Sequence, residues 1–80
     1  MDNYKTIEQK LRNLEPFHGN SLSGYWNDNK GGLDVYSYNT TIGQALFING
    51  EIVVDYFNAN KYSVTTSRHQ NLIRRAWGIK

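Results

Sequence analysis

The stretch that decides the fold is TTIGQALFINGEIVVDYF, residues 40–57. Asn49 and Gly50 stand between two runs rich in β-branched and aromatic residues, which is the strongest short-range signal for a β-hairpin. A two-residue turn fixes how the two strands pair. The predicted pairs are Ile48–Glu51, Phe47–Ile52, Leu46–Val53, Ala45–Val54, Gln44–Asp55, Gly43–Tyr56 and Ile42–Phe57.

This register gives the hairpin two different faces, because alternate residues of a strand point to opposite sides. The charge-free face is predicted to belong to the core and carries Gly43, Ala45, Phe47, Ile52, Val54 and Tyr56. The other face mixes apolar with polar residues and is predicted to be a protein interface, formed by Ile42, Gln44, Leu46, Val53, Asp55 and Phe57. An open apolar patch on a small protein usually marks an interface, and self-association is its simplest use. Alternatively, a helix closes this mixed face.

Helices are predicted at both ends of the chain. In residues 3–14 apolar residues recur at three- and four-residue steps, with Asp2 or Asn3 as the cap and Pro16 as the stop. In residues 67–77 the same spacing places five residues on one stripe, namely His69, Leu72, Ile73, Ala76 and Trp77. Ser67 and Gln70 are predicted to form a capping box there, and Gly78 to end the helix. On its apolar stripe, His69 is expected to be buried with a satisfied ring nitrogen.

Two further strands are predicted at residues 22–26 and 33–38, on either side of an Asn-, Asp- and Gly-rich turn. The chain is therefore predicted to be a single α+β domain, residues 1–80. It consists of a small antiparallel sheet of three or four strands with an N-terminal and a C-terminal helix. The hairpin and the two helices are expected to share one core, made of Ile7, Leu11, Ala45, Phe47, Ile52, Val54, Leu72, Ile73 and Trp77.

The charges are distributed unevenly along the 80 residues. Residues 61–80 hold five Lys or Arg and no Asp or Glu, whereas the preceding sixty hold four Lys or Arg and seven Asp or Glu. The chain has no cysteine, which excludes disulfides and thiolate metal sites and fits a reducing cytoplasm. It has no apolar run of the ~20 residues that span a bilayer, and its polar N-terminus lacks the apolar segment of a signal peptide. We therefore expect a cytoplasmic protein with no membrane partner.

No residue pattern points to catalysis. His18 lies near Ser21, Ser23 and Asp28, but the glycine-framed turn that exposes a nucleophilic serine is missing. Two histidines without further ligands do not make a zinc site, and residues 28–31 lack the carboxylates of a calcium loop. The sequence therefore predicts a protein that is not an enzyme and that uses no metal and no cofactor.

The predicted C-terminal helix offers a candidate anion-binding surface. Its expected start places hydroxyls and free N–H groups beside Arg68, and such helix ends bind anions. Further along, Arg68, Asn71 and Arg75 form a polar ridge, with Arg74 opposite the apolar stripe. An acid-free helix with an arginine ridge can contact phosphates. The predicted nucleic-acid or anion site consists of Thr66, Ser67, Arg68, Asn71, Arg74 and Arg75. Alternatively, the hydroxyls only cap the helix and the arginines are a solvated face.

Three stretches carry a resemblance to a known group of proteins. They are NSLS at residues 20–23, VYSYNTTI at residues 35–42 and KYSVTTSRHQ at residues 61–70. Together they resemble a family of small uncharacterised proteins encoded by bacteriophages, with Gly43 standing where that pattern leads us to expect Ala. The resemblance covers roughly residues 17–76 and implies a phage protein that acts in the cytoplasm of an infected bacterial cell.

Two functions remain open from the sequence. The first is a non-enzymatic phage accessory protein that contacts nucleic acid through the basic C-terminal helix. The second is an inhibitor of a host protein, such as a defence or replication component in the manner of an anti-CRISPR protein. It would bind through exposed aromatic and apolar residues of the sheet, because such residues favour protein interfaces or base stacking.

Overall fold

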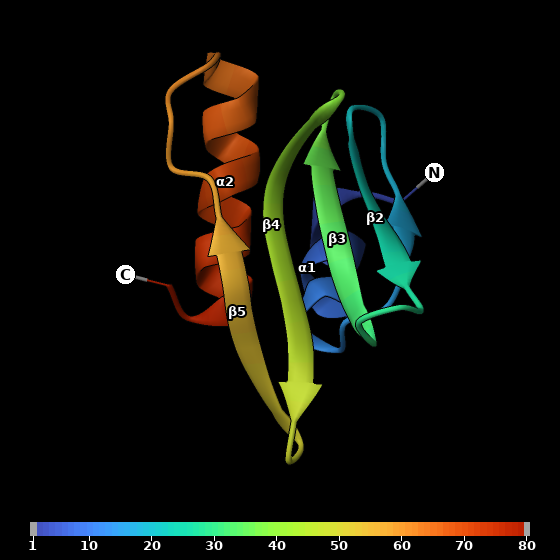
Figure 1. Ribbon diagram of the computed structural model, residues 1–80. Coiled ribbons are helices and arrows are strands. Elements are labelled where there is room, and N and C mark those ends of the chain that lie inside the picture. Colours follow the sequence, from blue (N-terminus) through green and yellow to red (C-terminus); the bar gives the residue numbers. More distant parts are fainter. Residues whose placement is uncertain (1, 80) are drawn as a thin grey trace.

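The computed structural model describes residues 2–79 and has two layers. One layer is an antiparallel sheet in which five strands follow one another in chain order; the other is a pair of helices behind that sheet in the view of Figure 1. The elements are α1 (Tyr4–Arg12), β1 (Phe17–His18), β2 (Leu22–Asn27), β3 (Gly32–Ser37), β4 (Thr40–Ile48), β5 (Glu51–Phe57) and α2 (Val64–Trp77). The predicted α+β class is confirmed.

The sheet has five strands rather than the predicted three or four. The additional strand is β1, in which Phe17 pairs with Gly24 and His18 with Ser23. Two residues are too few to show an alternating pattern, so this strand has no signature in the sequence. It forms because the ring of Phe17 is buried against Gly24, where a Cβ atom would collide with it.

The register of the β4–β5 hairpin is as predicted near its turn and shifted beyond it. The four pairs from Ile48–Glu51 to Ala45–Val54 are confirmed. A β-bulge follows, in which Asp55 has no partner, so the observed pairs are Gln44–Tyr56 and Gly43–Phe57. The predicted pairs Gln44–Asp55, Gly43–Tyr56 and Ile42–Phe57 are therefore wrong, because one extra residue moves every later side chain to the opposite face.

A second bulge lies between β3 and β4, where Val35 pairs with Gly43 and Tyr36 with Thr41. Ile42 is the extra residue, and it is completely buried in the core. The prediction that Ile42 lies on an interface face is therefore wrong. The same holds for Phe57, which packs partly buried against the core.

The core lies between the helices and one face of the sheet. Six of the predicted core residues are buried: Ile7, Leu11, Ala45, Leu72, Ile73 and Trp77. Ile52 and Val54 are partly buried against them. The prediction that Phe47 belongs to the core is wrong, since this residue is 44% exposed. Tyr56, which was predicted on the core face of the hairpin, is exposed as well. The cause for Phe47 is visible in Figure 1, where the β4–β5 turn extends past the ends of both helices.

The ends of the helices follow local hydrogen bonding. Asn3 caps α1 as predicted, its Oδ1 accepting a hydrogen bond from the N–H of Thr6. The cap of α2, however, is Ser63, whose Oγ accepts from the N–H of Thr66 at 3.1 Å. The predicted capping box is therefore wrong. Gly78 ends α2 in the left-handed conformation at φ 69°, as predicted.

Both helices pack on the same side of the sheet, and they contact each other along their length. The alternative in which a helix closes the mixed face of the hairpin is therefore not realised. Within residues 2–79, no helix combines the length and apolar character that crossing a membrane requires.

Candidate functional site

The start of α2 does not present the free hydroxyl and N–H groups that the sequence predicted at Thr66 and Ser67. Thr66 is buried, and its hydroxyl lies within hydrogen-bonding distance of Ser37 and Ser63. The N–H of Ser67 donates to the carbonyl oxygen of Ser63 within the helix. The prediction that Thr66 and Ser67 open an anion site at a helix end is therefore wrong, because the helix begins three residues earlier.

Gln70 has a different role from the predicted one. Its side chain is buried, and Nε2 donates to the carbonyl oxygens of Asn58 at 2.7 Å and Asn60 at 2.9 Å. These two bonds hold the connection between β5 and α2 in place. Gln70 thus stabilises the fold, and because its side chain is buried it does not form part of a binding surface.

The four remaining predicted site residues separate into two groups. Arg68, Asn71 and Arg75 line one cavity, whereas Arg74 lies over the ring of Phe57, 5.1 Å from its centroid. The Nε of Arg74 is buried and has no hydrogen-bond partner among the described residues. Arg74 therefore covers the edge of the core and takes no part in the surface formed by the other three.

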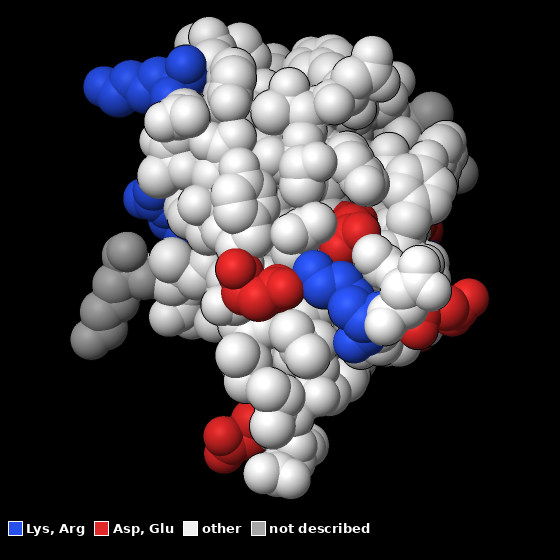
Figure 2. All heavy atoms as spheres, viewed as in Figure 1, with Lys and Arg blue, Asp and Glu red and all other residues white. Residues whose placement is uncertain are grey.

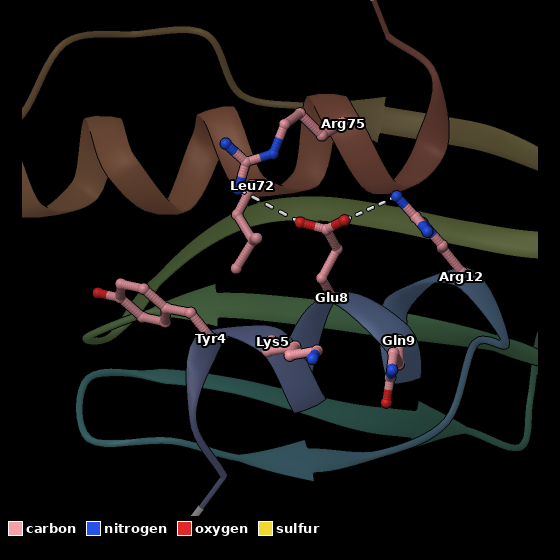
Figure 3. Close-up of a pocket in the computed structure, with 7 residues that line it drawn as sticks. All are labelled: Tyr4, Lys5, Glu8, Gln9, Arg12, Leu72 and Arg75. Carbon is pink, nitrogen blue, oxygen red and sulfur yellow. Dashed lines mark hydrogen bonds and ion pairs between the residues drawn. The ribbon is translucent and has the colours of Figure 1, made fainter.

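The line where α1 meets α2 is hollowed by two neighbouring cavities. One, of about 370 Å³, is lined by Tyr4, Lys5, Glu8, Gln9, Arg12, Leu72 and Arg75 and is shown in Figure 3. The second, of about 260 Å³, is lined by Tyr4, Arg68, Asn71, Leu72 and Arg75. Because they share three residues, we treat the two as one surface and call it the helix groove.

The helix groove has an apolar floor and a basic rim. Leu72 and Tyr4 belong to both cavities, and the rim carries Lys5, Arg12, Arg68 and Arg75. Its one carboxylate is Glu8, which accepts hydrogen bonds from Arg12 at 2.6 Å and Arg75 at 3.3 Å (Figure 3). Within residues 2–79, Lys5 and Arg68 form no ion pair. Four cations thus face a single anion.

The sequence interpretation missed the contribution of α1 to this surface. Lys5, Glu8 and Arg12 recur at three- and four-residue steps, so they share one side of α1. That spacing was visible in the sequence. Only the packing of α1 against α2 shows that this side borders the arginine ridge.

The buried polar cluster beside the helix groove resembles a catalytic pair but is closed to substrate. Nδ1 of His69 lies 2.7 Å from Oγ of Ser37, and Nε2 lies 3.2 Å from the hydroxyl of Tyr4. His69 and Ser37 are each 1% exposed. Burial lowers the pKa of His69. The expected burial of His69 with a satisfied nitrogen is confirmed, and its contacts tie α2 to β3 and α1.

The opposite surface of the molecule is the open face of the sheet, which no helix covers. It carries Ser23, Tyr25, Asp34, Tyr36, Gln44, Leu46, Val53 and Tyr56. Lys30, from the β2–β3 turn, pairs with Asp55 at 2.8 Å and Asp34 at 3.7 Å, and the hydrogen bond to Asp55 raises the pKa of Lys30. Figure 2 views this face and shows a largely uncharged surface, near the centre of which a basic side chain lies between acidic ones.

Four predicted interface residues belong to this open face: Gln44, Leu46, Val53 and Asp55. Asp55 is held there by its ion pair with Lys30. Val53 is 39% exposed. In the described part of the chain, no group of three or more His, Asp or Glu side chains is arranged to hold a metal ion.

Comparisons with known proteins place the chain in a family. A search of curated proteins found no match, and a search of solved structures found none either. Residues 1–77 match the family of unknown function DUF8033. Because the match covers nearly all of the 80 residues, the chain belongs to this family.

Proposed function

We propose that the protein acts without catalysis, by binding nucleic acid through the phosphate groups that fit the helix groove. The observation that carries the proposal is the rim of that groove, on which two helices place four cations and one carboxylate. Phosphate contacts by Lys and Arg supply most of the affinity of sequence-independent binding. The groove therefore suits the backbone of a nucleic acid better than its bases.

The distribution of charge over the molecule supports the same surface. Residues 16–60, which form the sheet, hold one Lys and four Asp or Glu. The helix α2 holds three Arg and no acidic residue. A polyanion approaching this protein is attracted to the helix layer and repelled by the sheet, which gives the complex one preferred orientation.

The test measures how binding depends on salt. Each phosphate contact contributes about −0.9 to the slope of log K against log salt. With one of four cations offset by Glu8, we expect a slope of about −3 for duplex DNA between about 50 and 200 mM salt, measured by fluorescence anisotropy. Removing Arg68 and Lys5 together should reduce the steepness of that slope by about two and leave the Glu8 ion pairs intact.

The matched control is Lys61→Ala, which removes an exposed cation outside the helix groove. It should leave the slope nearly unchanged. If Lys61→Ala changes the slope as much as the double variant Arg68→Ala, Lys5→Ala does, binding is not confined to the helix groove. Absence of binding at low salt would refute the proposal. The same titration with RNA of equal length decides which nucleic acid is preferred.

A second candidate function is binding of a protein partner to the open face of the sheet. The observation in its favour is that Leu46, Val53 and Tyr56 lie on that face with no helix over them. The partner is either a second copy of the chain or a host protein of the infected bacterial cytoplasm, as the phage resemblance implies. Contiguous exposed apolar side chains on a protein of this size usually mark such an interface.

Sedimentation velocity tests the self-association arm of this candidate. Because Val53 is exposed, Val53→Lys should fold normally and sediment more slowly than the parent protein if the open face joins two copies. Val64→Lys is the control, since Val64 is 73% exposed and lies at the first residue of α2. A parent protein that sediments as a monomer at every concentration excludes the second copy as occupant.

A further inference from the structure

The open face of the sheet contains a cavity for which the functions above name no occupant. It has a volume of about 480 Å³ and is lined by Ser23, Tyr25, Tyr36, Tyr38 and Asn39. The rings of Tyr25 and Tyr36 lie 5.9 Å apart and are tilted by 58°. We call this surface the tyrosine pocket. Three tyrosines and no charged side chain line it.

Tyr38 occupies an unusual backbone position for its size. It lies in the β3–β4 turn at φ 54°, in the left-handed region that favours Gly and Asn. Tyr38 is 59% exposed, and the centroid of its ring lies 6.5 Å from that of His69. Bulky residues held in such conformations cluster at functional sites. Tyr38 also lines the tyrosine pocket, and a binding role there fits a bulky residue held in this conformation.

The hydrogen-bonding groups of the tyrosine pocket are all able to donate. They are three phenol hydroxyls, the hydroxyl of Ser23 and the amide of Asn39. Within residues 2–79, the hydroxyls of Tyr25, Tyr36 and Tyr38 form no hydrogen bond to another protein group. A polyproline II segment is the complement, because its carbonyl groups accept hydrogen bonds, its prolines lack N–H donors, and its rings pack against aromatic faces.

The charges beside the tyrosine pocket define the partner further. Asp34 pairs with Tyr25 across the strands and lies two residues from Tyr36 on the same face. Lys30 is shared between Asp34 and Asp55, so one cation faces two carboxylates. Asp34 is buried and accepts a hydrogen bond from Asn27, whereas Asp55 is exposed. This negative surplus attracts a basic side chain. It also repels nucleic acid, which would otherwise stack on the tyrosine rings.

We propose that the tyrosine pocket binds an extended proline-rich segment of a partner protein that carries Lys or Arg beside its prolines. The partner's rings lie against Tyr25, Tyr36 and Tyr38, and its basic residue lies toward the exposed carboxylate of Asp55. This inference deepens the second candidate function by naming the chemistry of the partner. It does not depend on the helix groove.

The experiment titrates the isotope-labelled protein with a synthetic oligoproline ending in Arg and follows the amide resonances. The expected result is saturable shifts at Tyr25, Tyr36 and Tyr38, with weaker binding when Glu replaces the Arg of the peptide. Tyr36→Ala removes one aromatic ring from the pocket and should weaken peptide binding about tenfold. Tyr56→Ala, on the same face but outside the pocket, should bind like the parent protein.

Tyr38→Asn keeps the test decisive even if Tyr36→Ala fails to fold. Asn tolerates the left-handed conformation, so this variant should melt no lower than the parent protein and yet lose the peptide. The proposal is overturned if the oligoproline causes no shifts, or if Tyr38→Asn binds normally. It is also overturned if oligo(dT) occupies the pocket more tightly than the peptide. One combined outcome also overturns the proline-rich partner: the parent protein binds no peptide, and Val53→Lys abolishes self-association. That outcome supports the second candidate function with a second copy of the chain as the partner.

Discussion

At the scale of single residues, His69 shows how a polar side chain is accommodated in so small a core. Its two ring nitrogens meet the hydroxyls of Ser37 and Tyr4, which come from β3 and the start of α1. Its ring also makes an edge-to-face contact with Tyr4, at 5.9 Å between centroids. Buried polar groups are tolerated when they are hydrogen-bonded, so His69 joins three elements at little cost.

We predict that acidification destabilises the protein through His69. Burial holds the pKa of His69 below its ordinary value of 6.5 in the folded state. The unfolded chain therefore takes up the proton first as the pH falls, so this stability is present above pH 6.5 and is lost between 6.5 and the folded pKa. Urea unfolding at a series of pH values should show the free energy of unfolding decline in this window.

The matched variants separate His69 from the other titrating groups. The decline should persist in His18→Gln, because His18 is exposed, and disappear in His69→Gln. Asp2 acts in a different window. The N–H of His18 and the ammonium group of Lys10 lower the pKa of Asp2 below 3.8, so its contribution is lost only at more acidic pH. A decline that survives His69→Gln would contradict this assignment.

At the scale of elements, the start of α2 is decided by which serine accepts the first free N–H. Ser63 caps the helix, while Ser67 lies one turn inside it. We predict that Ser63→Ala lowers the free energy of unfolding by about 1 kcal/mol, the usual cost of losing a cap. Ser67→Ala should change it by less than about 0.5 kcal/mol. Urea denaturation measures both, and the opposite order would restore Ser67 as the cap.

At the scale of the whole molecule, Trp77 joins both helices to the sheet. Its Nε1 donates to the carbonyl oxygen of Leu11 in α1 at 2.9 Å. Its ring packs so closely on β4 that a Cβ atom at Gly43 would lie 2.9 Å from Cζ3. This contact explains why Gly stands at position 43: a methyl group there would push the indole ring out of its site.

We predict that Trp77→Ala lowers the free energy of unfolding by about 3–5 kcal/mol. An 80-residue domain buries only a modest share of its surface, so this loss is a large part of its total stability. Thermal unfolding followed by circular dichroism measures the effect. Trp26→Ala is the control, since Trp26 is exposed, and it should unfold close to the parent protein. Equal effects of the two changes would show that Trp77 does not hold the layers together.

The sequence by itself determined the features that depend on neighbouring residues. Asn49 and Gly50 fix the turn and the four pairs beside it, since a two-residue loop leaves the strands one register. The apolar spacing of the two helices, the cap at Asn3 and the stop at Gly78 are equally local. For the candidate site, the sequence identified Arg68, Asn71 and Arg75, because the absence of acidic residues in this helix is a property of composition.

Only the tertiary structure decided the features that depend on contacts between distant segments. The bulges at Ile42 and Asp55 form because an extra residue lets Ile42 and Phe57 face the core. The burial of these two side chains requires the helices, so it cannot be read from the hairpin sequence alone. The partner strand of β1 and the bonds of Gln70 to the β5–α2 connection are also non-local. The helix groove itself exists because α1 packs beside α2, which brings Lys5 and Arg12 next to arginines more than fifty residues away along the chain.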